Sequence, residues 1–247
     1  MANHLYIDST PAEVSSAPGL HLITQNTPNG QATQILLEEL AAVYGTPFTT
    51  TVIDISTNEQ KKEWFLRLNP NGRIPVVVDN TRSVAPGPFP IFETSAQLLY
   101  LADHFDKDHK LGFVDPLERS DVEQWLFFWH GGGAPYQGNL NYFARNAPDD
   151  QFGINRFKKE TLRVFGVIEI RLSGIYAADK QPREYLVGPG KGKYSIADIK
   201  AWSWIKNWPN RFTPEEVNEL PHLVAWVERI GARDAVKLGT GDKYKKA

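Results

Sequence analysis

The spacing of apolar residues between positions 20 and 105 changes several times between short unbroken runs and a helical period. Short apolar or β-branched runs have the length of strands, whereas apolar residues three and four positions apart indicate helices. The predicted strands are 20–24, 48–55, 74–79 and a short one within 86–93, and the predicted helices are 35–44, 58–68 and 93–105. The order predicts an α/β domain in which the first crossover is right-handed and parallel and the last two strands form a hairpin.

Beyond this region the apolar spacing is helical throughout. The polar stretch "DKDHKLGFVDP" ends in proline and is interpreted as a linker, and in "YSIADIKAW" Ser195 and Asp198 have the spacing of a structural capping box. The helices expected here are 117–130, 153–178, 195–208 and 221–231. The predicted organisation is an N-terminal extension (1–19), an α/β domain (20–105), a linker (106–116) and an all-helical domain (117–247). The polar segment "STPAEVSSAPG" predicts a loosely structured extension.

The composition of the chain argues against several classes of function. The chain has 247 residues, 41% apolar and 23% charged, which is typical of a soluble globular protein. A net charge of -2 without a long basic stretch argues against a nucleic-acid partner. No apolar run approaches the roughly 18 residues of a membrane-spanning helix and no signal peptide is evident, so we expect a cytoplasmic protein without a membrane partner. The absence of cysteine excludes disulfides, thiolate metal sites and a cysteine nucleophile, and the six histidines lack the spacing of metal ligands.

Candidate chemistry gathers at the turns of the α/β domain. Asn29 in "TPNG" lies near a helix N-terminus, where backbone N–H groups and the helix dipole favour anions. "NGRIPVVVD" offers the backbone of Ile74 at a strand edge beside Arg73, and "FETSA" places Glu93 at a second helix N-terminus. In an α/β layout these ends fall on one side of the sheet. A peptide with a free amine and carboxylates matches such a cleft.

Each of these residues also has an ordinary structural interpretation. Asn29 is compatible with a simple turn, Pro75 with a strand opener and Glu93 with a first-turn acid. Gln60 and Arg73 are compatible with solvated surface residues. The segment "WHGGGAP" lacks the lysine and the strand of a phosphate-binding loop, so we expect it to break or bend a helix. Four aromatic residues fit either a pocket for an apolar co-substrate or the core: Phe128, Trp129, Tyr136 and Tyr142.

Taken together, "NPNGRIPVVVD", "ETSAQLLYLADHF" and "YSIADI" resemble the soluble glutathione transferases over nearly the whole chain after residue 19. The longer combination "TPNG…EQ…FLRLNPNGRIP…FETSA…QWLFFWHGGGAPYQGN" resembles the Nu class and the fungal enzymes related to the yeast nitrogen-catabolite regulator. The resemblance implies a thioredoxin-like N-terminal domain, an all-α C-terminal domain, a homodimer and glutathione as co-substrate without a metal. A fungal source is our expectation.

The resemblance also implies roles for individual residues. Pro75 matches a cis proline that lets the backbone of Ile74 pair with the cysteinyl amide of glutathione, by a small strand addition. Glu93 matches the residue that takes the γ-glutamyl ammonium, and Thr94 stands where serine usually binds the γ-glutamyl carboxylate. The other positions carried over are Asn29 with Thr27 facing the sulfur, Gln60 at the glycine end, Arg73 near the ligand, and Arg156 reaching glutathione from the second domain.

The implied mechanism follows from thiol chemistry. A free thiol has a pKa near 8.5, so hydrogen bonds that stabilise the anion raise the fraction of thiolate. An asparagine cannot act as a base, so the role that the resemblance implies for Asn29 is to donate a hydrogen bond to the sulfur. The leading hypothesis is a detoxifying transferase acting on small apolar electrophiles, with or without peroxidase activity. The alternatives are a glutathione-dependent disulfide-bond reductase and a glutathione-binding regulator. A further alternative is a structural or elongation-factor-associated module. The complete set of site residues argues against this last alternative, because such a module has no need of them.

Overall fold

The computed structural model describes residues 5–207 and 212–246. The chain divides into two compact units: 1–107 together with 233–247, and 108–232.

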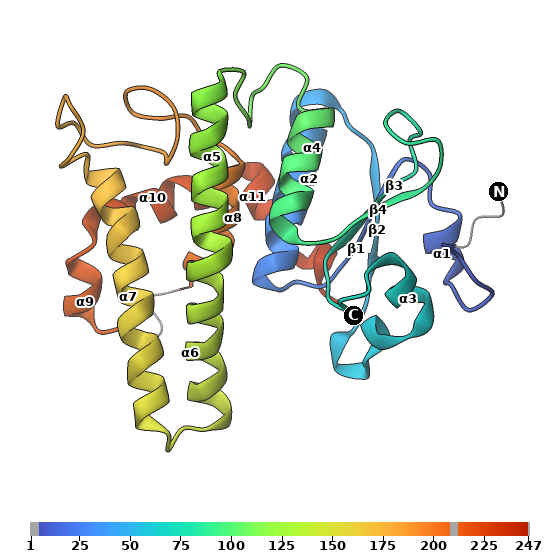
Figure 1. The fold of residues 1–247 in the computed structure, drawn as a ribbon, viewed down its shortest axis with the longest axis horizontal. Coiled ribbons are helices and arrows are strands. Elements are labelled where there is room, and N and C mark those ends of the chain that lie inside the picture. The colour runs from blue at the N-terminus through green and yellow to red at the C-terminus, as the bar shows by residue number, and fades with distance from the viewer. Residues whose placement is uncertain (1–4, 208–211, 247) are drawn as a thin grey trace. The chain divides into compact units, whose positions relative to one another are not determined.

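The first unit is built on a sheet with the strand order β2-β1-β3-β4. The strands are β1 (Leu20–Thr24), β2 (Phe48–Val52), β3 (Val76–Asp79) and β4 (Phe89–Ile91). β1 is parallel to β2 and antiparallel to β3, which forms a hairpin with β4. The helices α2 (Pro28–Tyr44) and α4 (Thr94–Phe105) cover one face of the sheet, and α3 (Glu63–Leu68) lies on the other (Figure 1). The predicted thioredoxin-like arrangement is confirmed.

Local capping alters two predicted elements of this unit. The second strand ends at Val52 instead of residue 55, because Asp54 accepts a hydrogen bond from Ser56 N (2.9 Å) and starts the 3₁₀ turn η1 (Ile55–Thr57). The helix predicted at 58–68 is divided by Lys62, whose extended backbone separates η2 (Glu59–Lys61) from α3. Local capping therefore fixed boundaries that the apolar spacing did not reveal.

The N-terminal extension is packed, in contrast to the loose segment that we expected. Its short helix α1 (Ala12–Ser15) buries Val14 completely in a cluster with Trp64 and Phe65. Tyr6 and Ile7 pack against the same cluster. A few dispersed apolar residues are therefore enough to cover this face of the sheet, although the segment is polar on average.

The second unit is helical, as predicted. Its elements are α5 (Pro116–Phe128), η3 (Trp129–Gly133), α6 (Ala134–Asn146), α7 (Gln151–Ser173), α8 (Ile196–Ile205), α9 (Pro214–Asn218) and α10 (Pro221–Gly231). The segment "WHGGG", which we expected to break or bend a helix, forms one π-helical turn that joins α5 to α6 without a break. Gly133 has no side chain and so leaves room for the ring of Trp129, which a Cβ there would approach to 2.4 Å. Among the described helices, none is both long and apolar enough to cross a membrane.

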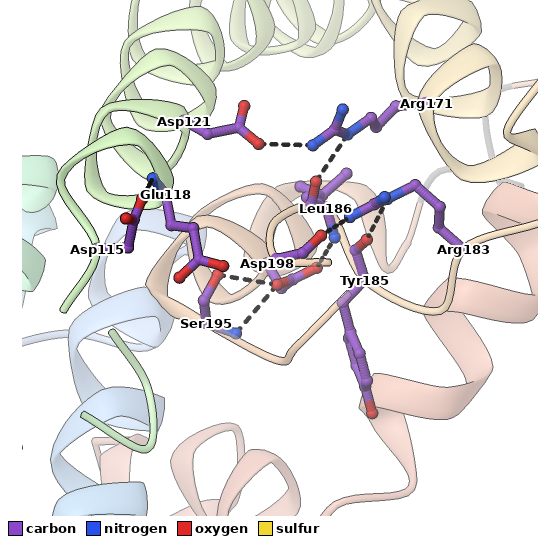
Figure 2. A network of polar contacts seen from close by, with 10 residues as sticks. Asp115, Glu118, Asp121, Arg171, Arg183, Tyr185, Leu186, Ser195 and Asp198 are labelled. Atoms are coloured by element: carbon purple, nitrogen blue, oxygen red, sulfur yellow. Dashed lines mark hydrogen bonds and ion pairs between the residues drawn. The ribbon is translucent and has the colours of Figure 1, made fainter. Parts of the chain in front are cut away.

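The predicted capping box begins α8. Figure 2 shows the Asp198 carboxylate between Ser195 and Leu186. It accepts hydrogen bonds from Ser195 N (3.0 Å), Leu186 N (3.0 Å) and Trp226 Nε1 (2.9 Å). Burial raises the pKa of Asp198 to about 6, and these hydrogen bonds act in the opposite direction by favouring the charged form. One carboxylate thus joins the start of α8 to a loop and to α10.

The C-terminal segment, defined here as residues 233–246, belongs to the first unit and not to the helical domain (117–247) in which the sequence analysis placed it. Its helix α11 (Asp234–Gly239) packs on α2, and Gly239 lies so close that a Cβ would come within 2.7 Å of Ile35 Cα. Arg233 forms two hydrogen bonds with Glu39 (2.7 and 2.9 Å), and the buried Tyr244 donates to Glu38 (2.6 Å). The sequence analysis predicted no helix at these positions, and local spacing could not reveal the contact with α2.

Candidate functional site

The first turn of α2 presents Asn29. Thr27 caps the helix by accepting a hydrogen bond from Gly30 N (3.2 Å), and Pro28 begins it without an N–H of its own. Gly30 permits the helix start to lie against the preceding loop, because a Cβ there would be 2.1 Å from Gln25 O. Asn29 is half-buried at the second position of this turn. The arrangement gives Thr27 a capping role and places the Asn29 side chain where the helix dipole favours an anion.

The loop before β3 is fixed by side chains at both ends. Asn69 accepts from Asn71 N (2.9 Å) and donates to Arg73 O (2.7 Å), so one buried amide spans the turn. Lys61 donates to Gly72 O (2.7 Å), and Gly72 itself has a φ of 61°, which favours glycine. The sequence identified this segment only as a turn, whereas the structure shows a rigid support for the residues that follow.

Ile74 and Pro75 stand at the end of this loop, and the peptide bond between them is cis, as expected. Within the described part of the chain, the backbone N–H and C=O of Ile74 have no hydrogen-bond partner, although β3 begins only two residues later. The Arg73 side chain beside them is exposed. An extended backbone with both polar groups available is what a docking peptide needs.

The start of α4 presents Glu93 and Thr94. Glu93 lies in the left-handed region, with φ 65° and ψ 114°, a conformation that costs energy for a residue with a side chain. Its exposed carboxylate accepts a hydrogen bond from Asn71 Nδ2 (3.3 Å), which links this turn to the preceding loop. Thr94 is buried, and its hydroxyl has no partner among the described residues. Backbone strain of this kind is concentrated at functional sites.

A buried amide connects these segments. Gln97 on α4 donates to Pro75 O (2.8 Å) and to Ile91 O (2.9 Å), and it accepts from the Thr33 hydroxyl on α2 (2.7 Å). The starts of α2 and α4 and the cis-proline loop are therefore joined by one set of hydrogen bonds. These bonds bring together the regions of Asn29, Ile74, Pro75, Glu93 and Thr94. Nothing in the sequence indicated a role for Gln97, because this residue interrupts the apolar face of its helix without any local motif.

Gln60 is not the solvated surface residue that one interpretation suggested, because only 9% of it is exposed. Its amide nitrogen donates to Ile55 O (3.1 Å), while its buried Oε1 has no partner within the described residues. Gln25, next to the start of α2, accepts from Ile55 N (3.1 Å). Gln60 is thus tied to the loop that precedes Asn29, with part of its hydrogen-bonding capacity unused.

Arg156 belongs to the second unit. It lies on α7, and half of its side chain is exposed. Its guanidinium pairs with the Glu160 carboxylate (3.3 Å) and lies 6.0 Å from the centre of the Tyr136 ring. Of the four aromatic residues with two interpretations, Trp129 is buried and stacked on Phe165, which places it in the core. Tyr142 is exposed, and Phe128 and Tyr136 are half-buried.

A separate cavity of about 490 Å³ lies in the second unit and contains none of these candidate residues. Its cations already have partners: Arg183 donates to Tyr185 O, Lys191 pairs with Glu184, and Arg229 donates to Glu184 O. We therefore assign these cations to loop structure. Among the described residues, no group of three or more histidine, aspartate or glutamate side chains is arranged to hold a metal ion.

Comparison with known proteins agrees with this architecture. Residues 28–104 match the family model of the glutathione S-transferase N-terminal domain, and residues 154–234 match that of the C-terminal domain. The chain therefore belongs to the glutathione S-transferase family, and glutathione transferase is the enzyme class that this membership gives it.

Individual relatives cover nearly all of the chain. The disulfide-bond oxidoreductase YfcG of Escherichia coli is 32% identical over 90% of this chain and 92% of its own. The solved structure of a glutathione transferase homologue from Lodderomyces elongisporus, with two glutathione molecules per subunit, is 34% identical, covers 90% of this chain and 97% of its own, and has a TM-score of 0.77. The solved structure of the nitrogen regulation fragment of the yeast prion protein Ure2p is 27% identical. It covers 96% of this chain and 100% of its own, and it has a TM-score of 0.79.

Proposed function

We propose that this chain binds glutathione in its first unit and activates the thiol as a thiolate for attack on small apolar electrophiles. The observation that carries the proposal is the rigid cis-proline loop, which leaves both backbone groups of Ile74 unpaired within the described residues. An antiparallel pairing of Ile74 with the cysteinyl amide of glutathione uses both groups. The glutathione-bound Lodderomyces relative supports the same ligand.

The remaining parts of glutathione find complementary groups around this edge. Glu93 takes the γ-glutamyl ammonium, and Thr94 offers its N–H and its hydroxyl to the γ-glutamyl carboxylate. Gln60 uses its second amide N–H toward the glycine end, where Arg73 adds positive charge. The role of Arg156 in glutathione binding, which the family resemblance implies, stays a prediction.

Asn29 donates a hydrogen bond to the sulfur, and the Thr27 hydroxyl, which accepts from Gly30 N, keeps its own proton for the same purpose. A shift of one pKa unit corresponds to about 1.4 kcal/mol, which a hydrogen bond to a charged group can supply. The thiolate then attacks the electrophilic carbon, a carbon–sulfur bond forms, and the leaving group departs with its electron pair. No protein base is needed, because the thiol loses its proton to solvent on binding.

A second candidate is glutathione-dependent disulfide reduction, which the similarity to YfcG favours. One glutathione thiolate attacks the disulfide, releasing a thiolate and leaving a mixed disulfide. A second glutathione thiolate attacks that mixed disulfide, so glutathione disulfide forms and the substrate becomes two thiols. The relative with two glutathione molecules per subunit supports a cleft large enough for this sequence.

We further propose that the chain belongs to the Nu class or to the fungal class related to the yeast nitrogen-catabolite regulator, and that it is a cytoplasmic homodimer. Similarity to Ure2p and YfcG over almost the entire chain supports this assignment. Size-exclusion chromatography with light scattering tests the homodimer, which a monomer at micromolar concentration would contradict.

The test of function is steady-state turnover with glutathione and two co-substrates, an aryl halide and hydroxyethyl disulfide. We expect Asn29→Ala to reduce turnover of the preferred co-substrate at least about tenfold, as loss of one charge-assisted hydrogen bond implies. Asn146→Ala, an exposed helix residue whose amide donates to Tyr142 O, is the matched control and retains full activity. Dominant conjugation supports the transferase, and dominant reduction supports the reductase. If the protein binds glutathione but catalyses neither reaction, it is a glutathione-binding protein and the proposed catalysis is wrong.

A further inference from the structure

Gln97 is a buried residue whose polar atoms all have partners. None of its surface is exposed, its nitrogen donates to the carbonyls of Pro75 and Ile91, and its oxygen accepts from the equally buried Thr33 hydroxyl. Two donor hydrogens and one acceptor are thus used within hydrogen-bonding distances of 2.7 to 2.9 Å. A fully satisfied buried amide specifies one arrangement of the elements around it.

Each partner of this amide is close in sequence to a group proposed to contact glutathione. Thr33 lies four residues after Asn29, and Gln97 lies four residues after Glu93 and three after Thr94. Residues three and four apart share a face of a helix. Pro75 follows Ile74 directly. The amide therefore links the sulfur end, the backbone docking edge and the γ-glutamyl end of the proposed site.

We propose that Thr33 and Gln97 are positioning residues for glutathione: their hydrogen bonds hold the first turns of α2 and α4 and the cis-proline corner in the relative placement that binds the tripeptide and ionises its thiol. This inference rests on the proposed function. It assigns a functional consequence to two core residues that touch neither the ligand nor solvent.

Thr33→Val tests the link, because valine has nearly the shape of threonine and removes only the donor to Gln97. Loss of one buried hydrogen bond, at about 1.4 kcal/mol, corresponds to about tenfold. We expect KM for glutathione to rise about tenfold, and the pKa of the bound thiol, followed by thiolate absorbance, to rise by several tenths of a unit. Thr33→Ser restores the donor and should return both quantities to within about twofold of the parent protein.

The matched control is Thr161→Val on α7, where an equally buried threonine donates to Phe157 O within its own helix (2.8 Å). We expect this variant to lose a similar amount of thermal stability while KM for glutathione and the thiol pKa stay unchanged. Gln97→Met keeps the volume of the side chain and removes all three hydrogen bonds, so it should shift KM further than Thr33→Val. It provides the second readout if one variant fails to fold.

The outcomes separate the two proposals. If the parent protein neither binds nor turns over glutathione, the proposed function fails and the positioning role fails with it. If the parent protein binds glutathione and Thr33→Val changes only the melting temperature, as Thr161→Val does, the function stands and the positioning role is refuted. A raised KM and thiol pKa in Thr33→Val, reversed by serine, establish the positioning role.

Discussion

Gln97 in the first unit and Asp198 in the second are both fully buried polar residues near the start of a helix, yet they bind different kinds of partner. Asp198 accepts from Ser195 N at the start of its own helix and from Leu186 N and Trp226 Nε1. Gln97 instead donates to carbonyls of the cis-proline loop and of β4. The carboxylate completes a helix terminus, whereas the amide fixes segments that carry candidate ligand contacts. On our proposal, the same degree of burial therefore serves stability in one region and site geometry in the other.

The largest expected effect is on the capping network of the second unit. Asp198→Asn turns an NH₂ group toward a buried N–H donor in either orientation of the amide, so we expect a loss of about 4 kcal/mol in the free energy of unfolding. Urea unfolding followed by tryptophan fluorescence reports it. Asp234→Asn, on an exposed side chain, is the control and should cost less than about 0.5 kcal/mol. Similar losses of unfolding free energy in both variants would show that Asp198 contributes no more to stability than an exposed aspartate.

Next in size is the ion pair that holds the C-terminal segment to α2. Arg233→Met leaves the buried Glu39 carboxylate without its partner, and we expect a loss of about 3 kcal/mol. The double variant Arg233→Met, Glu39→Met should recover most of it, because no charge then remains buried. Lys237→Met breaks an exposed pair on the same helix and should have little effect. A double variant no more stable than the single one would contradict this explanation, because the loss would then not come from the unpaired charge of Glu39.

The first unit should also lose stability in mild acid because of His21. Burial lowers the pKa of His21 to about 4, the opposing charge of Glu13 being the smaller effect. Since the unfolded pKa is about 6.5, the unfolded state binds the proton more readily, and stability declines as the pH falls from about 6.5 toward 4. We expect a loss of roughly 2 kcal/mol over this range, measured as the urea midpoint. His21→Gln should flatten the profile, and an unchanged profile in this variant would contradict the explanation.

The smallest expected change in free energy is that of a substitution at Glu93. This substitution tests most directly whether a residue binds the ligand or stabilises the fold. Glu93→Gln removes the charge proposed to meet the γ-glutamyl ammonium, and we expect KM for glutathione to rise about tenfold with the melting temperature almost unchanged. Steady-state kinetics and thermal unfolding on the same samples check this. A lower melting temperature at unchanged KM would make Glu93 part of the scaffold.

The sequence predicted the elements that depend on residues close together along the chain. The strands and the helices α2 and α4 follow from apolar spacing, and the Ser195–Asp198 cap follows from a motif four residues long. The cis peptide before Pro75 was expected from resemblance to a family and is confirmed. The roles proposed for Asn29, Glu93, Thr94 and Gln60 in binding glutathione stay predictions.

Features that depend on distant partners were not predictable in the same way. Gln97 meets Pro75 O across 22 positions, and Arg233 meets Glu39 across 194. Nothing in the neighbourhood of either residue indicates its partner. The π-helical turn at Trp129–Gly133 was missed for a related reason: adjacent glycines usually disrupt a helix, but here the close approach of the Trp129 ring favours glycine at position 133.

The ionisation of bound glutathione tests the central proposal most directly. The thiolate absorbance of glutathione is titrated against pH in complex with the parent protein and with Asn29→Ala. We predict a bound thiol pKa about one unit or more below the free value of about 8.5, and a return toward that value when Asn29 is removed. A thiol that titrates in the parent complex as it does in free solution would contradict activation by this site.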